Sequence, residues 1–505
     1  MQQILQRASS TARTSRTLII QQVQRLLSTQ LEFTKDRYNI DRGKFGTLDD
    51  THYGYFEDLL GKDRVIRDPE ECEAYNVDWV KNVKGMSKCI LKPKTTHEVS
   101  AILKFCNTHN LAVCPQGGNT GLVGGSVPVF DEIVLSTTLM NQIISVDDIS
   151  GAVVCQSGCI LETLDSHLAK YDLMVPLDLG AKASCNIGGN VSTNAGGLRL
   201  LRYGNLHGSV LGLEAVKADG DVVDCLSTLR KDNTGYHLKH MFIGSEGTLG
   251  VVTKVALQCP TRPKATNVAF LGTNSFQNVL KTFRKSKHSL SEVLSSFELI
   301  DAQSLNVVTK HFGKQCPISQ HPFYILIETH GSNATHDEEK LHSFLAETMS
   351  DGVVLDGTVS SDPSKIADIW QLRETITAAL QHDGYVFKYD FSIPIKTFYS
   401  IVEIMRERLG ESAVTVCGYG HIGDSNLHLN ITLKEYSEEV HGKIEPFVYQ
   451  YTSQMRGSVS AEHGIGFRKS KYLQYSKSAS AIGLMKSLKQ MMDPKGILNP
   501  YKVLP

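Results

Sequence analysis

The chain of 505 residues lacks any apolar run near the roughly 18 residues that a membrane-spanning helix needs. It also lacks an excess of charge, since 52 basic residues offset 53 acidic ones, so its net charge gives no sign of binding to nucleic acid or a charged membrane. Its 11 cysteines include no CxxC pair, and Cys155 and Cys159 come closest. The sequence therefore predicts buried thiols in a reducing compartment rather than a disulfide scaffold.

The N-terminus lacks acidic residues, since none occurs before Glu32, while it contains four arginines and many Ser and Thr residues. An acid-free, basic and Ser-rich N-terminus is typical of a mitochondrial transit peptide, and the alternative is a disordered basic tail. We therefore expect residues 1–31 to direct the protein to the mitochondrial matrix.

The length indicates two or three domains. Thr95 and Glu98 form a capping box at the start of a predicted helix. One face of that helix is apolar and carries Val99, Ile102, Leu103 and Cys106. Short apolar runs on both sides predict strands, so an α/β domain begins here. We divide the chain into five segments: a transit peptide (1–31), an N-terminal extension (32–84), a first domain (85–263), a second domain (264–450) and a C-terminal segment (451–505).

Three glycine-rich loops interrupt the predicted strands, at residues 115–126, 188–197 and 244–250. None is a GxGxxG dinucleotide motif and none is a P-loop. Glycine lets the backbone approach a ligand closely, and successive N–H groups can then bind a pyrophosphate. Three such loops close together in the chain favour a large, extended cofactor.

A second group of residues carries candidate metal ligands. His428 and Asn430 share one face of a predicted strand, and His421 lies in the loop before it. A third ligand would come from the pair Glu462-His463, giving two His and one carboxylate, as in catalytic zinc sites. The alternative is that the histidines are ordinary loop and core residues.

Two cations stand out because their surroundings are apolar. Asp362 and Pro363 begin a predicted helix that runs towards Gln381, and Arg373 lies in the middle of its apolar face. Lys388 lies on a following strand, opposite the aromatic residues. A cation on an apolar face needs either a protein carboxylate or an anionic ligand. Arg and Lys near one cleft would suit carboxylate groups.

The runs PQGGNTGLVGG, PLDLGAKASCNIGGNVSTNAGG, GSEGTLG and ILNPYK resemble the vanillyl-alcohol-oxidase type of FAD-binding oxidoreductase, over most of residues 85–505. The resemblance implies an α+β fold with a PCMH-type FAD-binding domain, an α/β substrate-binding cap and a C-terminal helical segment that returns to the flavin. The implied flavin contacts are Gly117, Gly118, Asn119, Thr120, Gly121, Gly125, Gly189, Asn190 and Asn499. Relatives with covalent flavin have a His or Cys in the first loop. This chain has neither, so we expect non-covalent FAD.

The resemblance also implies roles for the polar residues. The metal, expected to be zinc, would bind His421, His428 and Glu462, and His463 would be the catalytic base. The implied substrate contacts are Arg373, Thr377, Lys388, Asn430 and His463. One departure concerns Ser425, where relatives commonly have glycine, because a positive φ there would strain a serine.

Within this family the chain resembles members that oxidise small (R)-2-hydroxy acids. Two cations beside a metal suggest a dicarboxylate, so we expect conversion of (R)-2-hydroxyglutarate to 2-oxoglutarate. Metal-assisted proton abstraction would accompany hydride transfer to flavin N5, and electrons would pass to electron-transferring flavoprotein. A homodimer is left open. The alternatives are a D-lactate dehydrogenase of the same fold and a non-enzymatic flavin- or metal-binding scaffold.

Overall fold

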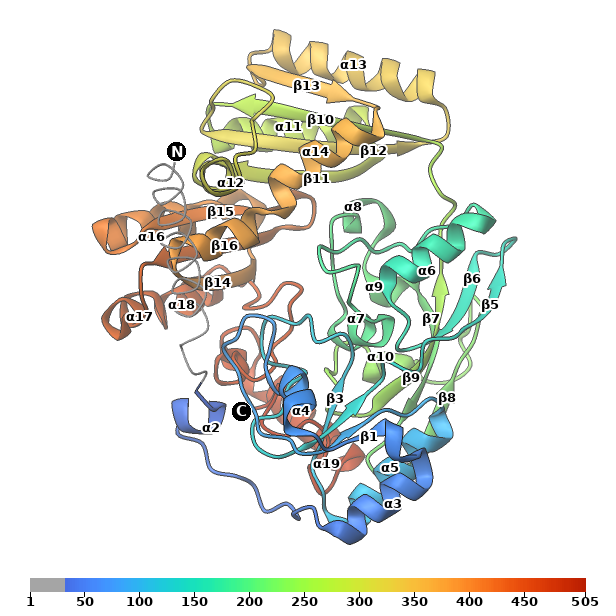
Figure 1. The fold of residues 1–505 in the computed structure, drawn as a ribbon. Helices are drawn as coiled ribbons and strands as arrows, with labels where there is room; N and C mark the ends of the chain where they lie inside the picture. Colours follow the sequence, from blue (N-terminus) through green and yellow to red (C-terminus); the bar gives the residue numbers. More distant parts are fainter. Residues whose placement is uncertain (1–31) are drawn as a thin grey trace, which may run out of the picture.

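The computed structural model describes residues 32–505, so the predicted transit peptide lies outside the described residues. Three β-sheets organise this part of the chain, and the seven-stranded sheet lies above the two smaller ones in Figure 1. The α+β architecture predicted from the sequence is therefore confirmed. No helix among the described residues is long and apolar enough to cross a membrane.

The four-stranded sheet has the order β1-β2-β4-β3. Its strands are β1 (Val65–Ile66), β2 (Ile90–Leu91), β3 (Val113–Gln116) and β4 (Ile133–Ser136). Helix α5 (Thr96–His109) begins with the predicted capping box, in which Thr95 and Glu98 bond each other's backbone. The four residues predicted for its apolar face are all buried in one core with β2, β3 and β4. Helix α3 (Asp50–Leu60) of the N-terminal extension packs on the same core.

The five-stranded sheet has the order β5-β6-β9-β7-β8. Its strands are β5 (Ile143–Asp147), β6 (Ala152–Gln156), β7 (Val210–Val216), β8 (Val222–Cys225) and β9 (Val251–Gln258). The second glycine-rich segment is a loop only in its last residues, because residues 188–193 lie in the short helix α7 (Ile187–Thr193), whose apolar residues pack on this sheet with α6 (Leu161–Leu168). All three glycine-rich loops therefore connect elements of the two smaller sheets.

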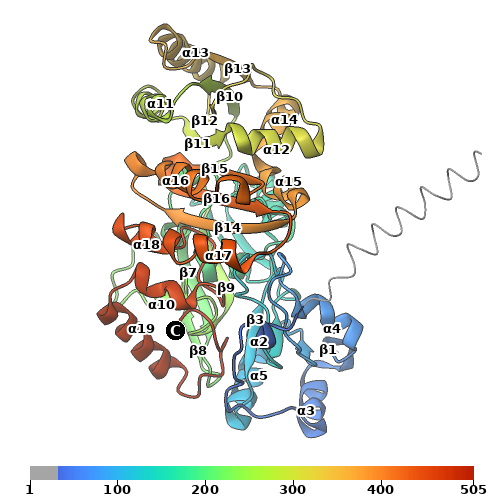
Figure 2. The same ribbon diagram turned by 90° about the vertical axis from the view of Figure 1, so that its left-hand side faces the viewer.

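The seven-stranded sheet has the order β13-β10-β12-β11-β15-β16-β14. Its strands are β10 (Ala265–Thr273), β11 (Leu294–Asp301), β12 (Phe323–Gly331), β13 (Asp356–Ser360), β14 (Tyr385–Ser392), β15 (Thr415–His421) and β16 (Asn426–Leu433). Helices α11 (Phe276–Ser289), α13 (Ala334–Ser350) and α16 (Ser400–Leu409) cover one face. Helices α12 (Ala302–Phe312), α14 (Pro363–Glu374) and α15 (Ile376–Ala379) cover the other (Figure 2).

The helix predicted to run from Pro363 towards Gln381 is shorter than expected. Asp362 caps α14 as predicted, by accepting the backbone N–H of Lys365 at 3.0 Å. The chain then leaves α-helical geometry at Thr375 alone, where both the N–H and the hydroxyl donate to the Gln371 carbonyl, and helical structure resumes in α15 and in a 3-10 turn at Leu380–Asp383. Arg373 therefore lies at the end of α14 rather than mid-helix.

The C-terminal segment returns to the four-stranded sheet. Helix α19 spans Ala479–Met492 and lies in the C-terminal helical segment that the family resemblance implied. The chain then runs beside β3, where Val113 exchanges backbone hydrogen bonds of 2.8 Å with Ile497 and Asn499. In Figure 1 α19 lies in the lower half of the molecule, near β3.

Candidate active site

A cavity of about 610 Å³ lies between the glycine-rich loops and the seven-stranded sheet. Its lining includes all three loops and side chains from α14, β14, β15, β16 and the C-terminal segment. Every site residue predicted from the sequence lines this cavity except Asn499. Residues that span more than half of the chain are therefore brought to one place.

The part of the cavity that the glycine-rich loops line fits a flavin nucleotide. Between Gly117 and Gly125, no backbone N–H donates to an acceptor among residues 32–505, so these donors are available for a pyrophosphate. Besides Lys388 Nζ, three buried polar atoms of the lining lack a partner within the described chain: Ser157 Oγ, Asn186 Oδ1 and Asn190 Oδ1. Buried polar atoms normally have partners, so this group of unpaired atoms fits a polar cofactor.

Two residues refine the flavin prediction. Asn499 lies outside the lining, and its side-chain amide donates to the carbonyls of Gly125 and Glu246 at 2.9 and 2.8 Å. It therefore ties the first glycine-rich loop to the third. Cys185 does line the cavity, but burial raises the pKa of its thiol, which makes it a weak nucleophile towards a flavin.

Three proposed metal ligands converge at the end of the cavity that adjoins the seven-stranded sheet. The Nε2 atoms of His421 and His428 are 3.4 Å apart. Glu462 Oε1 is 3.6 Å from His421 Nε2 and 3.5 Å from His428 Nε2. Ligands of a tetrahedral zinc at about 2.0–2.1 Å lie about 3.4 Å from one another. The three donor atoms therefore already have the spacing that a divalent metal requires.

The two imidazoles differ in protonation. Burial lowers the pKa of His428 to about 3, which leaves it neutral and ready to act as a ligand. Burial would also lower the pKa of His421, but the carboxylates of Glu298 and Glu462 outweigh it and hold that pKa well above its ordinary value. His421 Nδ1 donates to Glu298 Oε1 at 2.7 Å, so its Nε2 faces the other two donors.

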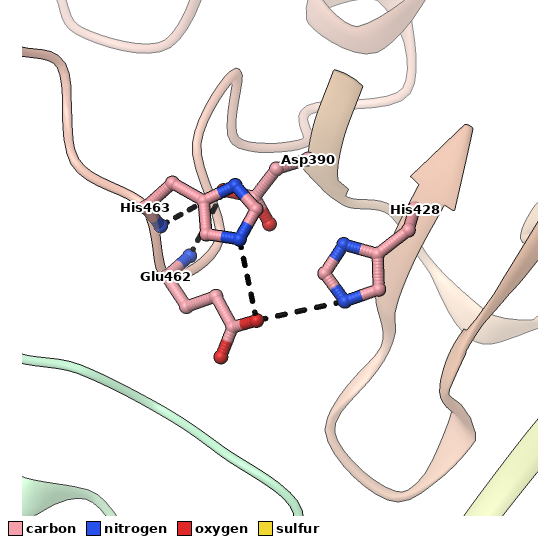
Figure 3. A group of neighbouring side chains, drawn as sticks. All are labelled: Asp390, His428, Glu462 and His463. Carbon is pink, nitrogen blue, oxygen red and sulfur yellow. Dashed lines mark hydrogen bonds and ion pairs between the residues drawn. The ribbon is translucent and has the colours of Figure 1, made fainter. Parts of the chain in front are cut away.

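Figure 3 shows a neighbouring group in which Asp390 and His463 lie next to His428 and Glu462. Ligand atoms of these four residues lie within 4.8 Å of one another. Asp390 Oδ2 already accepts the backbone N–H groups of Ala461, Glu462 and His463, at 3.1, 3.2 and 3.0 Å. Asp390 is thus occupied in holding the loop, and the shorter distances favour His421, His428 and Glu462 as candidate ligands.

His463 is suited to proton transfer. Its ring stacks on that of His428 at a centroid distance of 5.5 Å, and its side chain is one-quarter exposed to the cavity. Its Nδ1 is 3.6 Å from Asp390 Oδ2. The carboxylate orients the imidazole, so Nε2 is left towards Glu462, at 3.7 Å from Oε1.

Arg373 has both a protein partner and free donors. Its Nε donates to Glu298 Oε2 at 2.9 Å, and its guanidinium lies over the ring of Tyr419 at 4.6 Å. Neither Nη atom donates to an acceptor in the described part of the chain, and Arg373 lines the cavity. The sequence alone left a salt bridge and an anionic ligand as alternatives. The structure shows the salt bridge and leaves the Nη edge available for a ligand.

Lys388 is buried without an acceptor. Its Nζ has no hydrogen-bond partner among the described residues and lies 5.5 Å from the centre of the Trp79 ring. Burial, reinforced by the nearby Arg468, lowers the pKa of Lys388 to about 8. Asn430 lies directly opposite on β16. Thr377, on α15, shares a hydrogen bond of 2.7 Å with the Tyr419 hydroxyl. Lys388 is therefore the candidate anion-binding cation of the site, because its ammonium has no acceptor among the described residues.

Ser425 adopts the positive φ that was in question from the sequence. Its φ is +66°, in the left-handed region that glycine adopts without strain. The turn nevertheless forms between β15 and β16, and it leaves His421 and His428 adjacent.

The sequence interpretation missed three residues of the site. Glu298 had a detectable signal, because it is a lone carboxylate in the otherwise uncharged run Leu294–Ile300. Asp390 follows Lys388 by two residues, but nothing in the local sequence shows that it binds the backbone of residues 461–463. Trp79, from the N-terminal extension, had no local signal, and only the tertiary structure shows that it lines the cavity.

Comparison with known proteins agrees with this geometry. Residues 87–226 match the model of an FAD binding domain, and residues 262–503 match that of the C-terminal domain of FAD linked oxidases. The structure of p-cresol methylhydroxylase with substrate bound superposes with a TM-score of 0.73 at 16% identity, over 91% of this chain and 98% of that one. The chain therefore belongs to the family of FAD-linked oxidases, as its motifs predicted.

Relatives that match most of this chain show which kind of FAD-linked oxidase it resembles. Mitochondrial D-2-hydroxyglutarate dehydrogenase of Danio rerio is 59% identical over 91% of this chain and 86% of that protein. A putative mitochondrial D-lactate dehydrogenase of Schizosaccharomyces pombe is 49% identical over 91% of both. These relatives make the protein an FAD-dependent dehydrogenase and confirm the predicted mitochondrial location.

Proposed function

We propose that the protein oxidises (R)-2-hydroxyglutarate to 2-oxoglutarate. The observation that carries this proposal is the unpaired ammonium of Lys388 in the same cavity as the His421–His428–Glu462 group. A cation buried without a partner is unfavourable, so an anionic group of the substrate is its natural complement. The α-hydroxy acid end would lie at the metal ligands, and the distal carboxylate would meet Lys388.

The residues of the proposed site have separate roles in binding the substrate, accepting its proton and positioning the base. The Nη edge of Arg373 would hold a substrate carboxylate, with Thr377 and Asn430 beside it. His463 would take the proton of the α-hydroxyl, because its imidazole is oriented by Asp390 and faces the cavity. Asp390 and Glu246 would keep this base in place, since both carboxylates accept backbone N–H groups of residues 461–466.

The cofactors supply the remaining chemistry. Bound FAD would accept the Cα hydride at N5. A divalent metal, with zinc as the expected ion, would bind His421, His428 and Glu462 and lower the pKa of the substrate hydroxyl. We propose that electron-transferring flavoprotein reoxidises the flavin, a choice supported by the absence of an NAD motif in the sequence.

D-lactate is the alternative substrate, and the name of one relative keeps it in view. It has one carboxylate, which would leave Lys388 without an anion. Replacing Lys388 with Gln separates the two. We expect kcat/KM for (R)-2-hydroxyglutarate to fall about 10- to 100-fold, as for a lost charged hydrogen bond, and kcat/KM for D-lactate to change little. Equal losses on both substrates would contradict the proposed role of Lys388.

A further inference from the structure

Glu298 lies in the interior of the seven-stranded sheet, where a carboxylate needs strong partners. It is 1% exposed on strand β11, and it pairs directly with His421 across the β11–β15 register. Its neighbours on the strand are apolar, and its two oxygens bond side chains from α14 and β15. Such a buried charge persists only when its hydrogen bonds are complete.

Each oxygen of Glu298 serves a different part of the site. Oε1 accepts from Nδ1 of His421 at 2.7 Å, and Oε2 accepts from Nε of Arg373 at 2.9 Å. One side chain thus contacts both a proposed metal ligand and a proposed substrate-binding cation. No other carboxylate among the described residues accepts a hydrogen bond from His421 Nδ1 or Arg373 Nε.

The contact with His421 determines which ring nitrogen can bind a metal. In the neutral imidazole that a metal would bind, a hydrogen on Nδ1 that is donated to a carboxylate leaves the lone pair on Nε2. That Nε2 is the atom 3.4 Å from His428 Nε2 and 3.6 Å from Glu462 Oε1. The contact with Arg373 has a parallel effect, because it fixes the Nε edge and leaves the Nη edge for the cavity.

We infer that Glu298 is a positioning residue that sets the metal-binding tautomer of His421 and the orientation of Arg373 together, so that metal and substrate sites share one support. This inference rests on the proposed metal and substrate roles. It goes beyond these roles because it assigns the alignment of the metal and substrate sites to Glu298, which would contact neither the metal nor the substrate.

The variant Glu298→Gln tests the inference because glutamine keeps the size of the side chain but has only one acceptor. If its NH₂ group faced Arg373 Nε, two donors would meet, and arginine cannot give up its proton. The amide therefore turns its oxygen to Arg373 and its NH₂ group to His421 Nδ1. His421 relieves that clash by carrying its proton on Nε2, which blocks metal binding.

The measurement is the affinity of FAD-loaded, metal-stripped protein for Zn²⁺, by competition with a chromogenic chelator. We expect Glu298→Gln to weaken it about 10- to 100-fold while FAD content stays unchanged. Glu328→Gln is the matched control, since Glu328 is an equally buried carboxylate on the adjacent strand that bonds Arg199, His330 and Trp370 instead. It should bind Zn²⁺ like the wild type.

Wild-type affinity in Glu298→Gln would overturn the inference and leave the proposed function standing. Failure of the wild type itself to bind Zn²⁺ would instead refute the proposed metal role. Should Glu298→Gln not fold, ¹⁵N spectra of histidine-labelled wild-type holoenzyme decide, with His421→Asn identifying the signal. A proton on Nδ1 of His421 is the expected result, and an unprotonated Nδ1 would overturn the inference.

Discussion

Gly197 and Glu462 lie 265 residues apart in the chain, yet the backbone N–H of Gly197 donates to Glu462 Oε2 at 2.9 Å. The second glycine-rich loop thereby holds the carboxylate whose other oxygen faces His421 and His428. The proposed metal site is therefore assembled by the flavin-binding part of the chain as well as by the seven-stranded sheet.

This relationship predicts a sensitive position next to Gly197. A Cβ added at Gly196 would lie 2.9 Å from Glu462 Oε2 and 3.3 Å from its Cβ. We expect Gly196→Ala to displace that carboxylate and to weaken Zn²⁺ binding about tenfold or more, with FAD retained. Gly208→Ala is the control, because a Cβ there meets nothing within 4 Å. Unchanged Zn²⁺ affinity in Gly196→Ala would count against Glu462 as a ligand.

Removal of the metal should separate flavin binding from turnover. We expect chelation, or His421→Ala, to abolish nearly all activity while the visible flavin spectrum remains, because His421 belongs to β15 and not to the glycine-rich loops that would hold the flavin. Added divalent metal should restore the chelated wild type but not the variant. His336→Ala, at an exposed position, is the control. Full activity in a sample shown to be metal-free would disprove the metal role.

Lys388 predicts an alkaline limit on the reaction. Its lowered pKa of about 8 means that the ammonium is charged below pH 8 and is lost as the pH rises through that value. We therefore expect kcat/KM for (R)-2-hydroxyglutarate to fall above pH 8, and Lys388→Gln to lose that limb. The pH profile of both proteins between pH 6 and about 10 is the measurement. An identical alkaline limb in the variant would assign it to another group.

Ser425 offers a test of backbone strain. Its φ of +66° suits glycine, so Ser425→Gly should raise the free energy of unfolding by about 1 kcal/mol and keep activity. Denaturant unfolding of the holoenzyme measures it. Ser361, which does not have a positive φ, should gain nothing from the same change. A loss of stability at position 425 would show that the serine side chain is needed in the turn.

Local patterns in the sequence predicted much of the fold. The capping box at Thr95 and the apolar face of α5 depend on neighbouring residues, and both are confirmed. The break at Thr375 between α14 and α15 was missed because the apolar spacing continues across it, and hydrophobic periodicity does not show a change of backbone angles at one residue.

The candidate site was predictable only where motifs carried it. The residues proposed from the glycine-rich loops and the histidine region do line one cavity, apart from Asn499. The pairing of Arg373 with Glu298 spans 75 residues, and the approach of Trp79 to Lys388 spans much of the chain. Such contacts are set by tertiary packing, so a sequence can show an unpaired charge without naming its partner.

The central claim is that this flavin is reduced by an (R)-2-hydroxy dicarboxylate. Anaerobic stopped-flow mixing of the purified holoenzyme with separate (R)-2-hydroxyglutarate, (S)-2-hydroxyglutarate and D-lactate tests it most directly, by the loss of visible flavin absorbance. The account predicts rapid and complete bleaching by (R)-2-hydroxyglutarate, much slower bleaching by D-lactate and none by the (S) enantiomer. Faster reduction by D-lactate, or no reduction by (R)-2-hydroxyglutarate, would contradict it.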